Sequence, residues 1–165
     1  MSLDYEEIIT GESVLRRAPV GRHEAVCAAL HAAFAAALAG NPVARLLEPR
    51  SVVPLTPGTL LRPDLAVVTA ATGRLWLAAE VVSPTDHRWD TVTKKEVYED
   101  FAVPRLWMVD PRYDNVEVYH GSPHGLVLQH IYAGRESLTE ALLPALQLKV
   151  AELFGTAGSG KNISE

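Results

Sequence analysis

Two acidic residues beside apolar segments could bind a metal ion. Glu80 lies within the run Leu77-Ala78-Ala79-Glu80-Val81-Val82-Ser83-Pro84, whose other residues are typical of a buried strand. Burying an ionised carboxylate without a partner costs several kcal/mol, so Glu80 needs a compensating group. A divalent cation is one of the few groups that compensate a buried carboxylate strongly.

Asp64 is predicted to lie opposite Glu80 in a β-hairpin. The two strands are separated by Ala71-Thr72-Gly73. A three-residue turn with its glycine in the left-handed conformation places Asp64 directly across from Glu80, with Cβ atoms about 5 Å apart. That separation allows both carboxylates to bind one cation. A two-residue turn would shift the register by one and send them to opposite faces. The alternative interpretation is that Asp64 is an acid at a strand start that faces water and Glu80 a lone acid at a strand end.

Hydrophobic periodicity predicts the elements that position these acids. We expect helices at about 22–39 and 89–101 and strands near 44–48, 51–55, 64–69, 74–82, 105–109, 116–119 and 126–132, with a strand and a short helical turn between 142 and 154. The first dozen residues stay unassigned, apart from a short strand near 13–15. The Gly- and Ser-rich stretch 155–165 is expected to be a disordered tail, because it cannot bury enough apolar surface to become ordered.

The order of several short motifs carries a family resemblance. They are Arg62-Pro63-Asp64-Leu65-Ala66-Val67-Val68, Glu80-Val81-Val82-Ser83-Pro84, Asp90, Lys94, Tyr98 and Val103-Pro104-Arg105-Leu106-Trp107-Met108-Val109-Asp110-Pro111. Over about residues 5–154 the chain resembles the Uma2 family (domain of unknown function 820), within the PD-(D/E)XK superfamily of restriction-endonuclease-like nucleases. The resemblance implies an α/β fold with a restriction-endonuclease-like core, a mixed central sheet flanked by helices. We expect one such domain over residues 1–154.

The resemblance also implies the roles of three residues. Asp64 and Glu80 match the acidic pair that holds Mg²⁺ or Mn²⁺, and both are predicted to be catalytic. The superfamily usually has a lysine two residues after the second acid, but this chain has Val82 there. In Uma2-like proteins the lysine lies on the following helix, and the matching residue is Lys94. Lys94 is therefore predicted to be the third catalytic residue, which would orient the attacking water or stabilise the charge that develops on phosphorus.

Helical spacing favours Lys94 over its neighbour Lys95. Asp90, Lys94, Val97 and Phe101 lie along the side of the helix that packs on the sheet. Adjacent residues on a helix point about 100° apart, so Lys95 faces elsewhere. The alternative is that Lys94 is an ordinary solvated charge.

Three further residues are supporting candidates for the site. His23 and Glu24 begin the first helix, where many relatives have an additional acid. For His23 a hydrogen-bonding role at the edge of the core and a supporting role are both open. Tyr98 is favoured as a packing residue. The remaining histidines show no metal-ligand spacing.

The resemblance implies a Mg²⁺-dependent endonuclease that hydrolyses phosphodiester bonds in DNA. The alternative is a non-catalytic module that binds nucleic acid on the same scaffold. A net charge of −5 argues against holding nucleic acid by bulk electrostatics, although Arg16, Arg17, Arg22, Arg88, Lys94 and Lys95 could form a local cationic rim. A homodimer would allow both strands of a duplex to be cut.

The sequence also carries signals of cellular location. A single cysteine, Cys27, excludes an internal disulfide, and the N-terminus lacks the layout of a signal peptide. We therefore expect a cytoplasmic protein without a membrane partner.

The stretch from Gly155 to Lys161 has P-loop spacing, but Asn162 stands where a phosphate-binding loop needs Ser or Thr.

Overall fold

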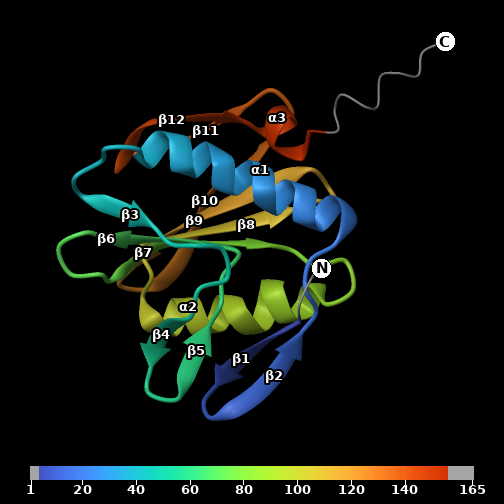
Figure 1. The fold of residues 1–165 in the computed structure, drawn as a ribbon, viewed down its shortest axis with the longest axis vertical. Helices are drawn as coiled ribbons and strands as arrows, with labels where there is room; N and C mark the ends of the chain where they lie inside the picture. The colour runs from blue at the N-terminus through green and yellow to red at the C-terminus, as the bar shows by residue number, and fades with distance from the viewer. Residues whose placement is uncertain (1–3, 156–165) are drawn as a thin grey trace.

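The computed structural model describes residues 4–155, and a six-stranded sheet lies at its centre (Figure 1). The strand order is β10-β9-β8-β7-β6-β3. The strands are β3 (Ala44–Leu46), β6 (Leu65–Thr69), β7 (Leu75–Val81), β8 (Arg105–Asp110), β9 (Asn115–Ser122) and β10 (Gly125–Ala133). Only β7 and β8 run parallel among these neighbours, so the sheet is mixed.

Different elements cover the two faces of the sheet. The helix α1 (Gly21–Leu38) lies on one face, together with β11 (Ser137–Glu140), β12 (Leu143–Lys149) and α3 (Val150–Phe154). The other face carries a helical segment made of a π-helical part, η1 (Trp89–Lys94), and an α-helical part, α2 (Lys95–Phe101). A second sheet, with order β2-β1-β5-β4, lies beside that segment. Its strands are β1 (Tyr5–Ile9), β2 (Glu12–Arg16), β4 (Val53–Thr56) and β5 (Thr59–Leu61).

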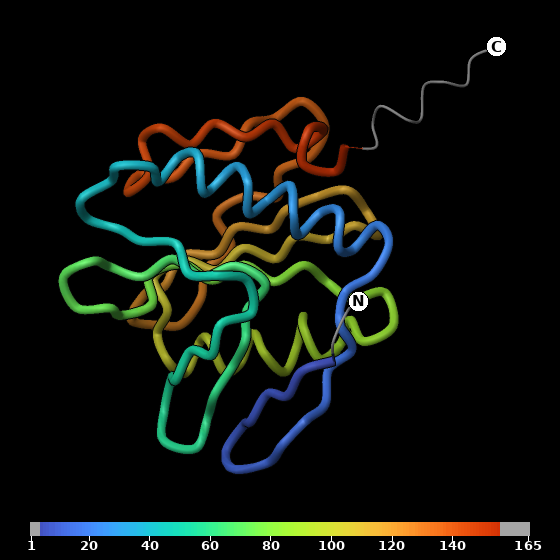
Figure 2. Tube along the Cα trace, viewed as in Figure 1, coloured from blue at the N-terminus to red at the C-terminus, as the bar shows by residue number. Residues whose placement is uncertain are grey.

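The second sheet joins segments that are distant in the sequence. Ile8 of β1 pairs with Leu60 of β5, and Figure 2 shows these two hairpins side by side beneath the central sheet. This pairing brings the N-terminal strand next to the η1–α2 segment.

Side-chain alternation along the central strands divides the core in two. Val67 and Leu77 belong to the apolar cluster under α1, whereas Ala66 and Ala78 belong to the cluster under α2. Because successive side chains of a strand point to opposite faces, a sheet covered on both faces must be apolar in nearly every position. An acid in such a strand is buried whichever way it points.

The connection from β7 to β8 places the η1 segment near the end of β7. Parallel neighbours cannot be joined by a tight turn and need a crossover. The chain leaves β7 after Val81, enters η1 at Trp89 and returns to β8 at Arg105. The first residues of the crossover helix therefore lie at the strand end that contains Glu80.

The structure confirms the predicted α/β fold and mixed sheet, and both predicted helices are present. Three short strands, β1, β5 and β11, were not predicted, because three to five residues are too few for a clear alternation. The stretch 155–165, predicted to be a disordered tail, and the P-loop spacing from Gly155 to Lys161 lie outside the described residues except for Gly155. Among residues 4–155 no helix is long and apolar enough to cross a membrane.

Candidate active site

Strands β6 and β7 pair so that Asp64 and Glu80 lie across from each other. Leu65 pairs with Ala79, and Ala66 pairs with Ala78. One step further toward the open end of the hairpin, the same register sets Asp64 opposite Glu80. The predicted register is therefore confirmed at this end.

The hairpin reaches that register by an unpredicted route. At the closed end Val68 pairs with Leu75, and the Thr69 N–H donates to the Arg74 carbonyl, so four residues form the turn instead of three. A bulge at Trp76 then shifts the pairing by one residue. Gly73 does adopt the predicted left-handed conformation, with φ of 71°. The three-residue turn was wrong, and the bulge compensates for the extra turn residue.

Glu80 is buried and receives two donors from the η1–α2 segment. The carboxylate is 2% exposed. Lys94 Nζ lies 2.7 Å from Glu80 Oε2, and the Tyr98 hydroxyl donates to the same oxygen at 2.5 Å. The compensating groups that the sequence demanded for Glu80 include a lysine and a tyrosine.

The buried residues of the η1–α2 segment are Asp90, Lys94 and Tyr98. The sequence predicted that Val97 and Phe101 would continue this row, but both are only half-buried. Asp90 and Lys94 are four residues apart in the π-helical part, and the same spacing in the α-helical part leads from Lys94 to Tyr98 instead of Val97. Short π-helical stretches occur frequently at functional sites.

The two adjacent lysines have different surroundings. Lys94 is fully buried, whereas Lys95 is half-buried with its Nζ 4.4 Å from the centre of the Tyr119 ring. The structure thus places Lys94, and not Lys95, beside Glu80. Its role in catalysis stays a prediction.

Glu7 of β1 is a member of the site that the sequence analysis missed. Its side chain is fully buried, and Lys94 Nζ donates to Oε2 at 2.7 Å. The Arg62 N–H donates to the same oxygen, and Arg16 Nη1 donates to Oε1 at 2.8 Å. One signal was available: Tyr5, Glu7 and Ile9 alternate with Glu6 and Ile8, which marks a strand with an acid on a partly apolar face.

Arg16 and Asp90 complete a buried network of charges. Arg16 Nη2 lies 2.8 Å from Asp90 Oδ1, and the Ser83 N–H donates to Asp90 Oδ2. Asp90 therefore fixes both the arginine and the backbone just after β7. Burial raises the pKa of Asp90 above its usual value, although Lys94 and Arg16 oppose the change.

The two acids that share Lys94 titrate differently. Burial raises the pKa of Glu80 to about 8, and Lys94 lowers it only in part. Burial also favours a higher pKa for Glu7, but Lys94, the Arg62 N–H and Arg16 together hold the pKa of Glu7 below its usual value. Burial by itself would lower the pKa of Lys94. The charges of Glu80 and Glu7 outweigh that effect and raise the pKa above its ordinary value. These directions favour Glu7 over Glu80 as the ionised partner of Lys94.

Asp64 lies where β6 begins and is 6% exposed. Its Oδ2 accepts a hydrogen bond from the Val81 N–H at 2.8 Å, and its Oδ1 lies 3.3 Å from Arg50 Nη1. The charge of Asp64 contributes to the raised pKa of Glu80. The two predicted metal ligands are therefore electrostatic neighbours.

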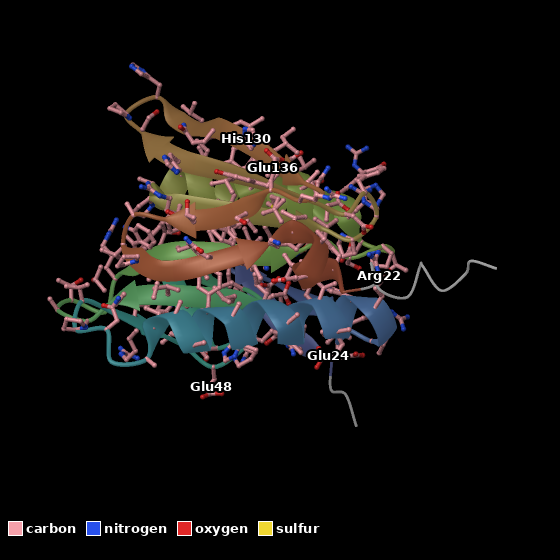
Figure 3. The ribbon with its side chains drawn as sticks, turned by 90° about the horizontal axis from the view of Figure 1, so that it is seen from above. Arg22, Glu24, Glu48, His130 and Glu136 are labelled. Carbon is pink, nitrogen blue, oxygen red and sulfur yellow. The ribbon has the colours of Figure 1, made fainter. Side chains whose placement is uncertain are left out.

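The supporting candidates have separate positions. His23 lies near Asp64 and Cys27, with ligand atoms of the three residues within 4.8 Å of one another. Glu24 is 52% exposed on the outer side of α1 and pairs with Arg50 at 3.6 Å (Figure 3). Glu24 is thus at the surface, because one helical position separates it from the inward-facing His23. Tyr98 was favoured as a packing residue, but it also donates to Glu80.

A polar cleft gives access to Asp64. Its lining residues are Tyr5, Leu15, Arg16, Arg17, His23, Asp64, Val81, Ser83, Thr85 and Asp86. The predicted cationic rim needs correction, because Arg16 and Lys94 are buried in ion pairs and do not form part of an exposed rim. Of the other predicted members, Arg17, Arg22 and Arg88 are exposed and Lys95 is half-buried. Arg22 pairs with Asp114, so Arg17 and Arg88 are the members most open to a phosphate backbone.

The acidic pair fits a hard divalent cation by its donor chemistry. Mg²⁺ and Mn²⁺ prefer carboxylate oxygens, and carboxylate oxygens have further lone pairs beyond one hydrogen bond. Among residues 4–155, both partners of Glu80 contact Oε2, which leaves Oε1 open to a ligand. Burial together with the Asp64 charge disfavours an ionised Glu80, and a cation would relieve that penalty.

Comparisons with known proteins agree with this architecture. The Uma2 family, described as "Putative restriction endonuclease", matches residues 2–151. A crystal structure of a putative nuclease belonging to DUF820 from Anabaena variabilis superposes with a TM-score of 0.74. That protein is 16% identical, and the match covers 90% of this chain and 89% of the other. A comparison with curated proteins gives no match.

Proposed function

The chain belongs to the Uma2 family of putative restriction endonucleases, and on this premise we propose that it is a Mg²⁺-dependent endonuclease that hydrolyses phosphodiester bonds in DNA. The observation that carries the proposal is the position of Lys94, fully buried with Nζ 2.7 Å from Glu80 Oε2. The chain has Val82 where a lysine is usual, and the crossover helix supplies an ammonium to the same carboxylate.

Asp64 and Glu80 are the residues that would hold the cation in this proposal. Bound there, Mg²⁺ or Mn²⁺ would polarise a phosphate oxygen and lower the pKa of a bound water. Lys94 and Tyr98 keep the Glu80 carboxylate fixed through Oε2. Glu7 fixes Lys94 in turn, so the ammonium stays protonated beside the place where charge develops on phosphorus.

The alternative function is a module that binds nucleic acid without cutting it. The net charge of −5 and the small number of exposed arginines at the cleft favour it. Against it stands the buried cluster of Glu7, Glu80 and Lys94, because a protein that only binds a phosphate backbone does not need acids beside it.

Incubation with DNA and RNA tests the proposal. Purified protein is mixed with supercoiled plasmid, single-stranded DNA and RNA, each with Mg²⁺, Mn²⁺ or a chelator. We expect nicking or linearisation of plasmid that needs the metal and is lost in Asp64→Asn and Glu80→Gln. Binding of DNA with no cleavage under any metal condition would support the binding module instead.

The lysine pair gives a matched control for the same assay. Lys94→Ala should lower the cleavage rate by about a hundredfold or more, the scale expected when one preorganised charge is lost. Lys95→Ala should keep the rate and only weaken salt-sensitive association with DNA. Circular dichroism and the melting temperature of each variant show whether it is folded. Equal losses of rate in the two folded variants would contradict the role assigned to Lys94.

A further inference from the structure

Three side chains with different ligand atoms, those of His23, Cys27 and Asp64, converge between α1 and the start of β6. His23 and Cys27 lie one helical turn apart on α1, and Asp64 lies at the start of β6. A ring nitrogen of His23, the Cys27 sulfur and a carboxylate oxygen of Asp64 all lie within 4.8 Å of one another. Residues four apart share a helix face, so the helix presents the imidazole and the thiol to the strand together.

A second observation concerns the polar atoms of this cluster. His23 Nε2 is buried and, among residues 4–155, has no hydrogen-bond partner. A buried polar atom left without a partner costs about 1–3 kcal/mol. A neutral imidazole nitrogen that carries no proton has a free lone pair, and a metal ion is one partner that uses it.

We propose that His23, Cys27 and Asp64 form a binding site for Zn²⁺ or a similar thiophilic divalent cation. Imidazole, thiolate and carboxylate are the three common protein ligands of zinc, and three protein ligands leave a fourth, open position. Ligand atoms around a tetrahedral zinc lie roughly 3.3–3.8 Å apart, so the cluster needs to close by at most about 1.5 Å on binding. The Cys27 thiol gives its proton to solvent as the metal–sulfur bond forms.

Arg50 is the positive charge that this site must displace. Its Nη1 lies 3.3 Å from Asp64 Oδ1. Burial and the Asp64 charge raise the pKa of the Cys27 thiol, and Arg50 opposes that change only in part. Its Nη2 lies 3.6 Å from Glu24, which is half exposed at the surface. A cation at the cluster therefore moves the guanidinium toward Glu24, and Arg50 acts as a competing counter-ion in the metal-free protein.

This thiophilic site is distinct from the proposed magnesium site, although the two share Asp64. The magnesium site pairs Asp64 with Glu80 and offers only oxygen, whereas the cluster on α1 adds nitrogen and sulfur. Soft thiolate ligands select zinc over magnesium. Bound zinc would therefore hold Asp64 on the α1 side and reduce binding of Mg²⁺.

Cobalt titration of the full chain tests the site, since Co²⁺ substitutes for Zn²⁺ and gives a thiolate-to-metal absorption band. Cys27 is the only cysteine, so any such band must come from it. We expect the band in wild type, its loss on adding Zn²⁺, and its absence in Cys27→Ser. His23→Gln should weaken cobalt binding at least tenfold.

Two control variants separate this proposal from the nuclease. Glu80→Gln removes a proposed magnesium ligand and should keep the cobalt band, whereas Arg50→Gln should tighten cobalt binding. X-ray absorption of the zinc-loaded wild type should show one sulfur at about 2.3 Å and nitrogen or oxygen at about 2.0–2.2 Å. A wild-type protein that binds cobalt with no thiolate band, or zinc with no sulfur ligand, would overturn the site whether or not DNA is cut.

Discussion

One buried lysine serves two buried acids, and this shapes the energetics of the site. Lys94 Nζ lies 2.7 Å from an oxygen of Glu7 and 2.7 Å from an oxygen of Glu80. A single positive charge cannot fully compensate two carboxylates in a low-dielectric interior. Glu80 is the acid with the raised pKa, so Lys94 stabilises its ionised form only in part.

Substitution of the two acids should change stability in opposite directions. Burial raises the pKa of Glu80 from about 4.5 in the unfolded chain to about 8, so the native state favours a proton on Glu80 and this residue makes stability fall as pH rises through that window. Glu80→Gln cannot ionise and should be more stable than wild type, by about 1 kcal/mol or more at pH 8. Urea denaturation from pH 5 to 8 in chelator measures the growing difference.

Glu7 should show the reverse behaviour. Its lowered pKa means that it stabilises the native state above the unfolded value of about 4.5, and that this contribution is lost as pH falls through the native pKa. Glu7→Gln should therefore be less stable than wild type at pH 7, with a smaller difference in acid. A stabilised Glu7→Gln or a destabilised Glu80→Gln would contradict the assignment of the proton to Glu80.

At the scale of elements, the β6–β7 hairpin shows what sets the register at the site. Its turn has one residue more than predicted, yet Leu65 still pairs with Ala79 because the bulge at Trp76 absorbs the extra residue. A slip by one residue would turn every apolar side chain of a strand to the other face. The buried faces of both strands thus determine the register, and the turn adapts to them.

Substitution of the turn glycine, Gly73, tests whether the strands or the turn determine the register at the site. Gly73 has φ of 71°, which an L side chain adopts only with strain, so Gly73→Ala should cost about 1 kcal/mol in the free energy of unfolding. Among residues 4–155, apart from its chain neighbours, no atom lies within 4 Å of the added Cβ, so the cost is conformational and not steric. Mn²⁺ affinity, measured by calorimetry, should equal that of wild type. A loss as large as that of Asp64→Asn would mean that the turn controls the site.

At the scale of the molecule, three separate parts of the chain build the site. The N-terminal hairpin supplies Glu7, the central hairpin supplies Asp64 and Glu80, and the crossover helix supplies Lys94. Pairing of β1 with β5 and the crossover from β7 to β8 hold these parts together. Ligand binding at such a junction should stabilise the whole fold, because the ligand contacts only the folded arrangement.

Thermal unfolding with added metal measures that coupling. Mn²⁺ at a hundredfold excess over its dissociation constant should stabilise wild type by about 2.7 kcal/mol, or roughly 5–10 °C in melting temperature. The double variant Asp64→Asn, Glu80→Gln should show no such increase, whereas Lys95→Ala should respond like wild type. Equal shifts in wild type and the double variant would place the metal elsewhere.

Local features of this architecture can be predicted from the sequence alone. The strand pattern and Gly73 indicated a hairpin in which Asp64 lies opposite Glu80. Helical spacing indicated that Lys94, and not Lys95, faces the sheet. These features follow from side-chain periods of 2 and 3.6 residues, which act within one element or between neighbours joined by a short turn. They are therefore readable without a structure.

Partners that come from distant segments could not be predicted from the sequence and are known from the three-dimensional structure. Glu7 lies 87 residues before Lys94 and reaches it because β1 pairs with β5 in the second sheet. His23 lies beside Asp64 because α1 crosses the face of the central sheet. Periodicity tells which face of an element is buried, but the packing of that face against another element depends on the simultaneous fit of all the layers. For this reason the acid pair was visible in the sequence, whereas the second partner of Lys94 and the cluster of His23, Cys27 and Asp64 were not.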